Sequence, residues 1–260
     1  MNQDKQREHA LAAIAAGIRS DGRGLLEYRE FTVERGVSST AHGSSRVQSG
    51  DQIVIAGVKF ELGTPYPDTP LDGSLMVSAE LLPLSNRVFE AGPPSIDSIE
   101  LARVTDRTIR ESKALDLSSL CIEPSKSSWT VAVDIAPINA NGSLFDISAL
   151  AALVAIRDAR KPFVEGRVPD YERLTDERLE LVRLPITVTV YKVGAYFIVD
   201  PTQDEERYCD ARLSIATLDS ETVCALQKGL AGSLTIADIE TMVDIALRKG
   251  VELRALVTAA

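Results

Sequence analysis

Three arginines recur at helical spacing in the segment between residues 97 and 116. Arg103, Arg107 and Arg110 stand at positions i, i+4 and i+7, so at about 100° per residue their side chains fall within roughly 60° of one another on a helix. Guanidinium groups held on a rigid element suit phosphate groups, because each can donate two parallel hydrogen bonds. The spacing therefore indicates a cationic stripe that could clamp a polyanion.

The same segment also offers a purely structural use for these arginines. Acids are spaced to pair with all three along the helix surface, namely Glu100, Asp106 and Glu111. Such pairs contribute about 0.2–0.5 kcal/mol each and are common on solvated helix faces. Spacing alone leaves both interpretations open.

Few other residues are arranged for catalysis. No phosphate-binding loop, dinucleotide-binding motif or serine hydrolase motif occurs. Candidate acid or base carboxylates are Asp134, Asp146, Asp200 and Asp210, but no local spacing brings two of them together. Residues 139–143, before a predicted helix, are similar to an anion-binding helix N-terminus, yet Asp146 in the first turn already occupies that positive field.

Composition limits the classes of partner. The 260 residues carry 28 Lys and Arg against 38 Asp and Glu, a net charge of −10, and 45% of them are hydrophobic. A sizeable core is expected, because this hydrophobic fraction is ordinary for globular proteins. The negative charge argues against nucleic acid or anionic membrane binding over the whole surface but leaves room for a local basic site.

Cysteine and histidine are too few for the usual metal and catalytic sites. Three cysteines form no C-x-x-C pair, and the presence of only two histidines argues against a multi-histidine metal site and a histidine-based triad. We therefore expect no metal and no cofactor. No targeting segment or membrane span is visible, so we expect a cytoplasmic protein without a membrane partner.

Two blocks of strands, each followed by a helix, must position these residues. The first block includes strands within residues 31–84, a helix over 97–115 that Asp97 caps, a strand at 129–135 and a helix at 144–156. The second includes strands at 185–191, 195–199, 212–216 and 222–227 and a helix over 235–249. This predicts an α/β protein of the α+β type with an internal duplication.

Charge runs and element boundaries divide the chain into four parts. The balanced charges between residues 157 and 183 predict a solvated linker with one exposed helical piece. The expected parts are an N-terminal helix and extension (1–28), a first domain (29–165), a charged linker (166–183) and a second domain (184–260).

Longer motifs carry a family resemblance. Arg19-Ser20-Asp21-Gly22-Arg23, with Arg29 after it, resembles the R-x-D-G-R…R opening of the RNase PH family, and residues 43–45 resemble its G-S-A strand start. The stretches 61–70, 90–94, 99–107 and 111–116 resemble the larger, non-catalytic RNase PH-type subunit of the archaeal exosome. The resemblance runs from about Arg19 to Val251.

The resemblance implies both a fold and an assembly. The fold would be the RNase PH fold, with duplicated βββαβα-like halves of the ribosomal protein S5 domain 2-like type. The assembly would be a hexameric ring, a trimer of heterodimers with a catalytic RNase PH-type subunit that degrades RNA 3′→5′ by phosphorolysis, joined by RNA-binding cap subunits. In it, Arg103, Arg107 and Arg110 would hold the backbone of single-stranded RNA without reading its bases.

Two positions depart from the active members of this family. Where they have an arginine in a phosphate-binding turn, this chain has Phe145, followed directly by Asp146. Active members also have an E-A-D segment whose aspartate is the proposed general acid, and this chain has Arg212 at that position. A guanidinium stays protonated and so cannot donate the proton that a general acid must supply. We therefore expect these to be lost catalytic positions in a non-catalytic subunit that supports an exoribonuclease.

Two alternatives remain open from the sequence. A stand-alone RNase PH-like phosphorolytic exoribonuclease would use Asp210 as its acid, whereas a scaffold would use the arginines for ion pairs only. The acidic segment 200–221 further predicts a divided surface, acidic over the second half and basic only at the Arg103 face.

Overall fold

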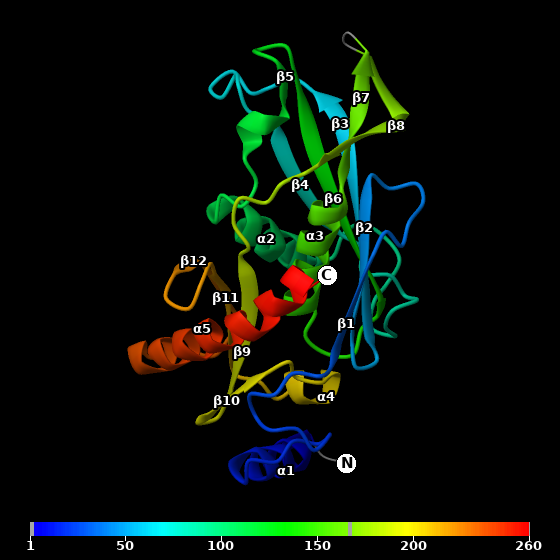
Figure 1. Cartoon of the computed structure of the whole chain (residues 1–260). Coiled ribbons are helices and arrows are strands. Elements are labelled where there is room, and N and C mark those ends of the chain that lie inside the picture. The colour runs from blue at the N-terminus through cyan, green and yellow to red at the C-terminus, as the bar shows by residue number, and fades with distance from the viewer. Residues whose placement is uncertain (1–2, 166–167, 260) are drawn as a thin grey trace.

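The computed structural model describes residues 3–165 and 168–259, so residues 1–2, 166–167 and 260 of the expected parts lie outside the described residues. Two β-sheets lie toward opposite ends of the molecule, and helix α3 (Phe145–Asp158) lies between them (Figure 1). Within the described residues, no helix is both long and apolar enough to cross a bilayer.

The first sheet holds the strands of the first block. Its order is β1-β2-β3-β6-β4, antiparallel throughout except where β4 runs parallel to β6, and β5 pairs with β6 off this path. The strands are β1 (Phe31–Arg35), β2 (Gly43–Ser49), β3 (Gln52–Gly63), β4 (Ser74–Ala79), β5 (Cys121–Glu123) and β6 (Ser127–Asn139). The strand β4 lies at an edge, beside helix α2 (Ile96–Glu111).

The second sheet is smaller and antiparallel, in the order β10-β9-β11-β12. Its strands are β9 (Ile186–Val193), β10 (Tyr196–Val199), β11 (Ala211–Thr217) and β12 (Val223–Gly229). The short helix α4 (Gln203–Glu206) precedes β11, and α5 (Ile236–Ala259) follows β12 and packs on β9 and β11. Strands followed by a helix thus occur twice, as predicted, although the two sheets differ in strand number.

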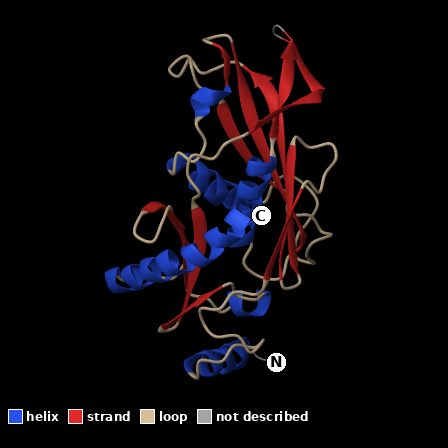
Figure 2. Cartoon of the chain, viewed as in Figure 1, coloured by secondary structure: helices blue, strands red, loops and turns tan. Residues whose placement is uncertain are grey.

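The helix α3 has no solvated face, and this explains its composition. All residues from Phe145 to Ile156 are buried, because α3 packs on β2 and β3 of the first sheet and on β9 of the second (Figure 2). A helix that is apolar all round is stable only when it is covered on all sides. One hydrophobic cluster therefore includes residues from both sheets and from α2, α3 and α5.

Two predicted boundaries differ from the structure. Ser95, rather than Asp97, is the N-cap of α2, because its side chain accepts from Ser98 N at 3.1 Å while Asp97 lies in the first turn. The helix α5 runs beyond its predicted end at Lys249, since Leu253 and Val257 are buried in the core. A helix α1 (Gln3–Ala15) forms the predicted N-terminal helix, and η1 (Leu117–Leu120) is a short 3₁₀ turn.

The predicted helical piece in the charged linker is wrong. The strands β7 (Arg160–Glu165) and β8 (Val168–Arg178) form a separate antiparallel sheet there. Arg173 lies 4.2 Å above the ring of Phe163, and Tyr171 stacks on His42 with ring centroids 6.1 Å apart. A few aromatic contacts hold this sheet, and the exposed charges around them conceal its strand pattern in the sequence.

Candidate functional site

The three predicted arginines lie on one face of α2, beside the edge strand β4. The opposite face of α2 is apolar and buried, with Leu101, Val104 and Ile109 in the core, so the arginine face is directed away from it. Arg103, Arg107 and Arg110 line a hollow of about 270 Å³ together with β4. The structure therefore brings the three side chains together at one surface.

Arg103 and Arg107 are not engaged by the acids placed to pair with them. The side chain of Arg103 is exposed and forms no hydrogen bond or ion pair with any other residue that the structure describes. Arg107 Nη1 donates to Gln227 Oε1 on β12, and sequence reasoning missed this contact, because the two residues are far apart in the chain. The cationic charge of both side chains remains without an ion pair among the described residues.

Arg110, in contrast, forms the predicted pair with Asp106. Its Nε and Nη2 atoms donate to the two carboxylate oxygens at 3.0 and 2.7 Å, and Nη2 also donates to Leu75 O on β4 at 2.9 Å. Of the three arginines, this one fits the scaffold alternative. We therefore expect Arg103 and Arg107 to contribute more to anion binding than Arg110 does.

The two departures, Phe145 and Arg212, meet in a second hollow of about 280 Å³. The Arg212 Cζ atom lies 4.1 Å from the centre of the Phe145 ring, a cation–π contact. Arg212 Nη2 lies 2.5 Å from Glu100 Oε1, and the Arg212 side chain is 7% exposed. This guanidinium is already occupied by an aromatic ring and a carboxylate.

The charges around this second hollow disfavour a phosphate. Asp97, Glu100 and Glu206 line it, and Arg212 is its one cationic side chain among the described residues. Burial raises the pKa of Glu206, whose Oε1 accepts from the Tyr191 hydroxyl at 3.0 Å. An anion would meet up to three carboxyl groups and a guanidinium that is already paired.

The start of α3 is closed rather than open to a ligand. Tyr28 donates to Asp146 Oδ2 at 2.6 Å, and burial raises the pKa of Asp146 to about 6. Gly142, with φ of +115°, approaches the chain so closely that an added Cβ would lie 2.0 Å from Pro201 O. The turn that resembles a phosphate-binding loop is packed against another segment of the protein.

The carboxylates considered for acid–base chemistry are held by other partners. Asp210, the acid of the stand-alone enzyme alternative, pairs with Arg7 at 2.6 Å, accepts from Gly194 N at 2.7 Å and does not line the hollow that holds Arg212. Asp134 accepts from Ser78 Oγ at 2.5 Å. In residues 3–165 and 168–259, no group of three or more His, Cys, Asp and Glu side chains is placed to hold a metal ion.

The arginines of the N-terminal motif bind the loop after β10 and the helix α4 that follows it. Arg23 and Arg29 contact Asp200 Oδ2 and Oδ1 at 2.8 and 2.5 Å, and Arg19 Nη2 lies 2.6 Å from Glu205 Oε2. Asp200 has a positive φ of 47°. Because these partners lie more than 170 positions away from the arginines, no local sequence signal reveals them.

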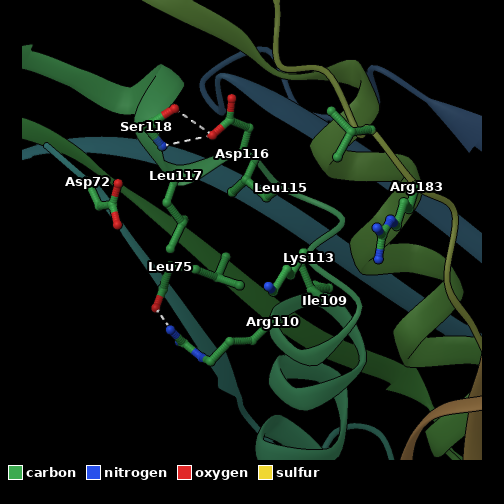
Figure 3. Close-up of a pocket in the computed structure, with 11 residues that line it drawn as sticks. Asp72, Leu75, Ile109, Arg110, Lys113, Leu115, Asp116, Leu117, Ser118 and Arg183 are labelled. Atoms are coloured by element: carbon green, nitrogen blue, oxygen red, sulfur yellow. Dashed lines mark hydrogen bonds between the residues drawn. The ribbon is translucent and has the colours of Figure 1, made fainter. Parts of the chain in front are cut away.

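A larger hollow of about 580 Å³ continues past Arg110, between the end of α2, the start of β4 and residues 182–183 (Figure 3). Basic Lys113 and Arg183 line it, but so do the acidic Asp72 and Asp116. Asp116 caps η1 by accepting from Ser118 N at 3.0 Å. Its mixed charges single out no ligand class.

Comparisons with known proteins show the family to which the chain is similar. The two models of the 3′ exoribonuclease family match residues 27–162 (RNase PH, domain 1) and 183–249 (RNase PH, domain 2). The chain is 43% identical to the exosome complex component Rrp42 of Methanopyrus kandleri, covering 98% of this chain and 96% of that protein.

Two solved structures share its fold over nearly the whole length. A chain of the Archaeoglobus fulgidus exosome with RNA bound to the active site has a TM-score of 0.89 at 39% identity, with 97% of each chain covered. A chain of an archaeal exosome core has a TM-score of 0.85 at 36% identity, covering 98% of this chain and 97% of that one. The chain belongs to the RNase PH family of 3′ exoribonucleases and, within it, to the group of Rrp42 proteins.

Proposed function

We propose that this protein is a non-catalytic exosome subunit that holds the backbone of single-stranded RNA for a catalytic RNase PH-type partner. The observation that carries the proposal is the contrast between two sites. Arg103 and Arg107 present cationic groups without ion pairs among the described residues at one surface, whereas the guanidinium of Arg212 in the second hollow already contacts Phe145 and Glu100, and that hollow is lined by acids.

The relatives support the assembly that we propose. Similar chains are components of archaeal exosomes, one of them with RNA bound to the active site. The protein would form a hexameric ring with the catalytic subunit, a trimer of heterodimers, to which RNA-binding cap subunits attach in the cytoplasm. Within it, Arg103 and Arg107 would neutralise phosphates without selecting bases, with Arg110 at the end of the same face.

Reconstitution tests the division of labour. The purified chain alone should release no nucleoside diphosphates from RNA in phosphate buffer, and the ring with a catalytic RNase PH-type partner should release them. Phosphate-dependent release by the isolated chain would establish the stand-alone phosphorolase instead, with Asp210 as the first residue to substitute.

Charge reversal tests the RNA-binding face. Arg103→Glu with Arg107→Glu should weaken RNA binding by the ring and lower the slope of log affinity against log salt by about 0.7 for each phosphate that is no longer neutralised. The matched control is Arg35→Glu with Arg248→Glu, which changes the net charge equally at exposed positions on β1 and α5. An unchanged affinity and salt slope in the first variant would favour the scaffold alternative.

A further inference from the structure

Two of the contacts that join the arginine helix α2 to the second sheet involve its charged side chains. Glu100 pairs with Arg212 on β11 at 2.5 Å, and Arg107 donates to Gln227 on β12. Glu100 lies one turn before Arg103, at a spacing where a glutamate and an arginine pair readily on a helix. In the structure Glu100 is directed to Arg212 instead, and Arg103 has no partner among the described residues.

Arg212 is held firmly in the place from which it binds Glu100. One side of its guanidinium faces the Phe145 ring at 4.1 Å. Another side abuts the backbone of β12, where a Cβ added to Gly229 would lie 2.4–2.6 Å from guanidinium atoms. Enclosed in this way, the group has little freedom to turn, and it offers Glu100 a cation that is better desolvated than exposed Arg103.

We infer that Arg212 is a positioning residue that withholds Glu100 from Arg103 and so keeps Arg103 available for an RNA phosphate. The inference rests on the proposed function and assigns a role to a residue at one of the lost catalytic positions. If the charge of Arg212 were removed, Glu100 would be free to pair with Arg103 and would add an unpaired carboxylate beside the RNA path. Both effects oppose phosphate binding.

The test uses the ring reconstituted with the catalytic partner and a single-stranded RNA substrate. Arg212→Gln should raise KM for RNA about three- to tenfold at low salt with kcat nearly unchanged, because one carboxylate near one phosphate is worth about that much. Glu100→Gln should not raise KM, and adding it to Arg212→Gln should restore the wild-type value. The control Lys126→Gln, which removes one positive charge from an exposed position on the turn before β6, should change nothing.

The restored value distinguishes this role from a merely structural one. If the ion pair only braced α2, Glu100→Gln would raise KM as much as Arg212→Gln does, and the double variant would not recover; that result would overturn the inference. Should Arg212→Gln fail to fold, Glu100→Gln alone decides, because a raised KM contradicts the inference and an unchanged or lowered KM supports it. Arg103→Ala tests the proposed function separately. If this variant leaves KM for RNA unchanged, the proposed function itself is refuted.

Discussion

At the residue scale, the first turn of α3 contains an acidic side chain of its own. The N-terminus of a helix favours a negative charge, and here the buried carboxyl group of Asp146 takes that position, with the Tyr28 hydroxyl donating to it at 2.6 Å. Burial opposes ionisation and raises the pKa of Asp146 to about 6. The protein thus carries an acid that is partly protonated just below neutral pH.

This carboxyl group should make stability depend on pH in an unusual direction. Between about pH 4 and pH 6 the folded chain holds a proton on Asp146 that the unfolded chain has released, so the free energy of unfolding falls as pH rises through this window. Asp146→Asn removes this contribution, and its stability relative to wild type should grow by about 3 kcal/mol between pH 4 and pH 7. Urea unfolding of both proteins at several pH values measures the difference.

Tyr28→Phe provides a check on the same contribution. The Tyr28 hydroxyl stabilises the ionised form of Asp146, so its removal should raise the pKa of Asp146 further and extend the window above pH 6. A difference between wild type and Asp146→Asn that does not vary with pH would contradict the assignment.

Two arginines on the same helix face should respond to alanine in opposite ways. Arg110→Ala removes a pair with Asp106 and a hydrogen bond to Leu75 O, and should lower the free energy of unfolding by about 0.5–1.5 kcal/mol. Arg103→Ala, exposed and unpaired among the described residues, should change it by less than about 0.5 kcal/mol. Arg103→Ala should instead lower the RNA affinity of the ring more than Arg110→Ala does. Equal decreases of affinity in both variants would contradict this division.

At the element scale, buried ion pairs attach the N-terminal extension and Arg29, the residue that follows it, to the loop after β10. Asp200 accepts from Arg23 and Arg29, and all three side chains are at most 11% exposed. Removing one member of such a cluster is costly, because the other members stay buried without their counter-charge. Asp200→Ala should therefore destabilise the chain by about 3–5 kcal/mol.

A neighbouring acid serves as the control for Asp200. Asp204 is 84% exposed and pairs with Arg207 at 3.4 Å, so Asp204→Ala should change stability by less than about 0.5 kcal/mol. Chemical denaturation of both variants tests the contrast. A decrease below about 1 kcal/mol for Asp200→Ala would show that the cluster does not fix the extension.

Local patterns predict the elements of this protein better than they predict its long-range contacts. The helix α2 and the strands β3, β6 and β9 follow apolar periodicity, so the fold class is visible in the sequence. The small sheet of β7 and β8 is not visible in the sequence, because charged residues cover it and only a few aromatic contacts hold it. The pairs Glu100–Arg212 and Arg107–Gln227 join residues more than 100 positions apart, which periodicity cannot reveal.

At the scale of the whole molecule, we expect the negative charge and the RNA-binding face to be separated in space. The net charge of −10 disfavours binding of RNA over the entire surface, while the face of Arg103 and Arg107 offers a local exception. A divided surface, acidic over the second half of the chain, stays a prediction. Its consequence is that the isolated chain should bind RNA weakly and depend on the ring to align several such faces.

The two halves should also unfold together. Buried residues of both sheets belong to one hydrophobic cluster, and α3 is covered by both. Separating the halves would expose the face of α3 that packs on β9, which includes several large aliphatic side chains, at a cost of about 25 cal/mol per Å² of apolar surface. Because neither half can bury this helix alone, we expect a single cooperative transition.

Calorimetry of the chain should show one peak with equal calorimetric and van't Hoff enthalpies, and residues 184–260 expressed alone should not fold. Two resolved peaks, or a cooperative transition in that fragment, would show that each half has a core sufficient for itself.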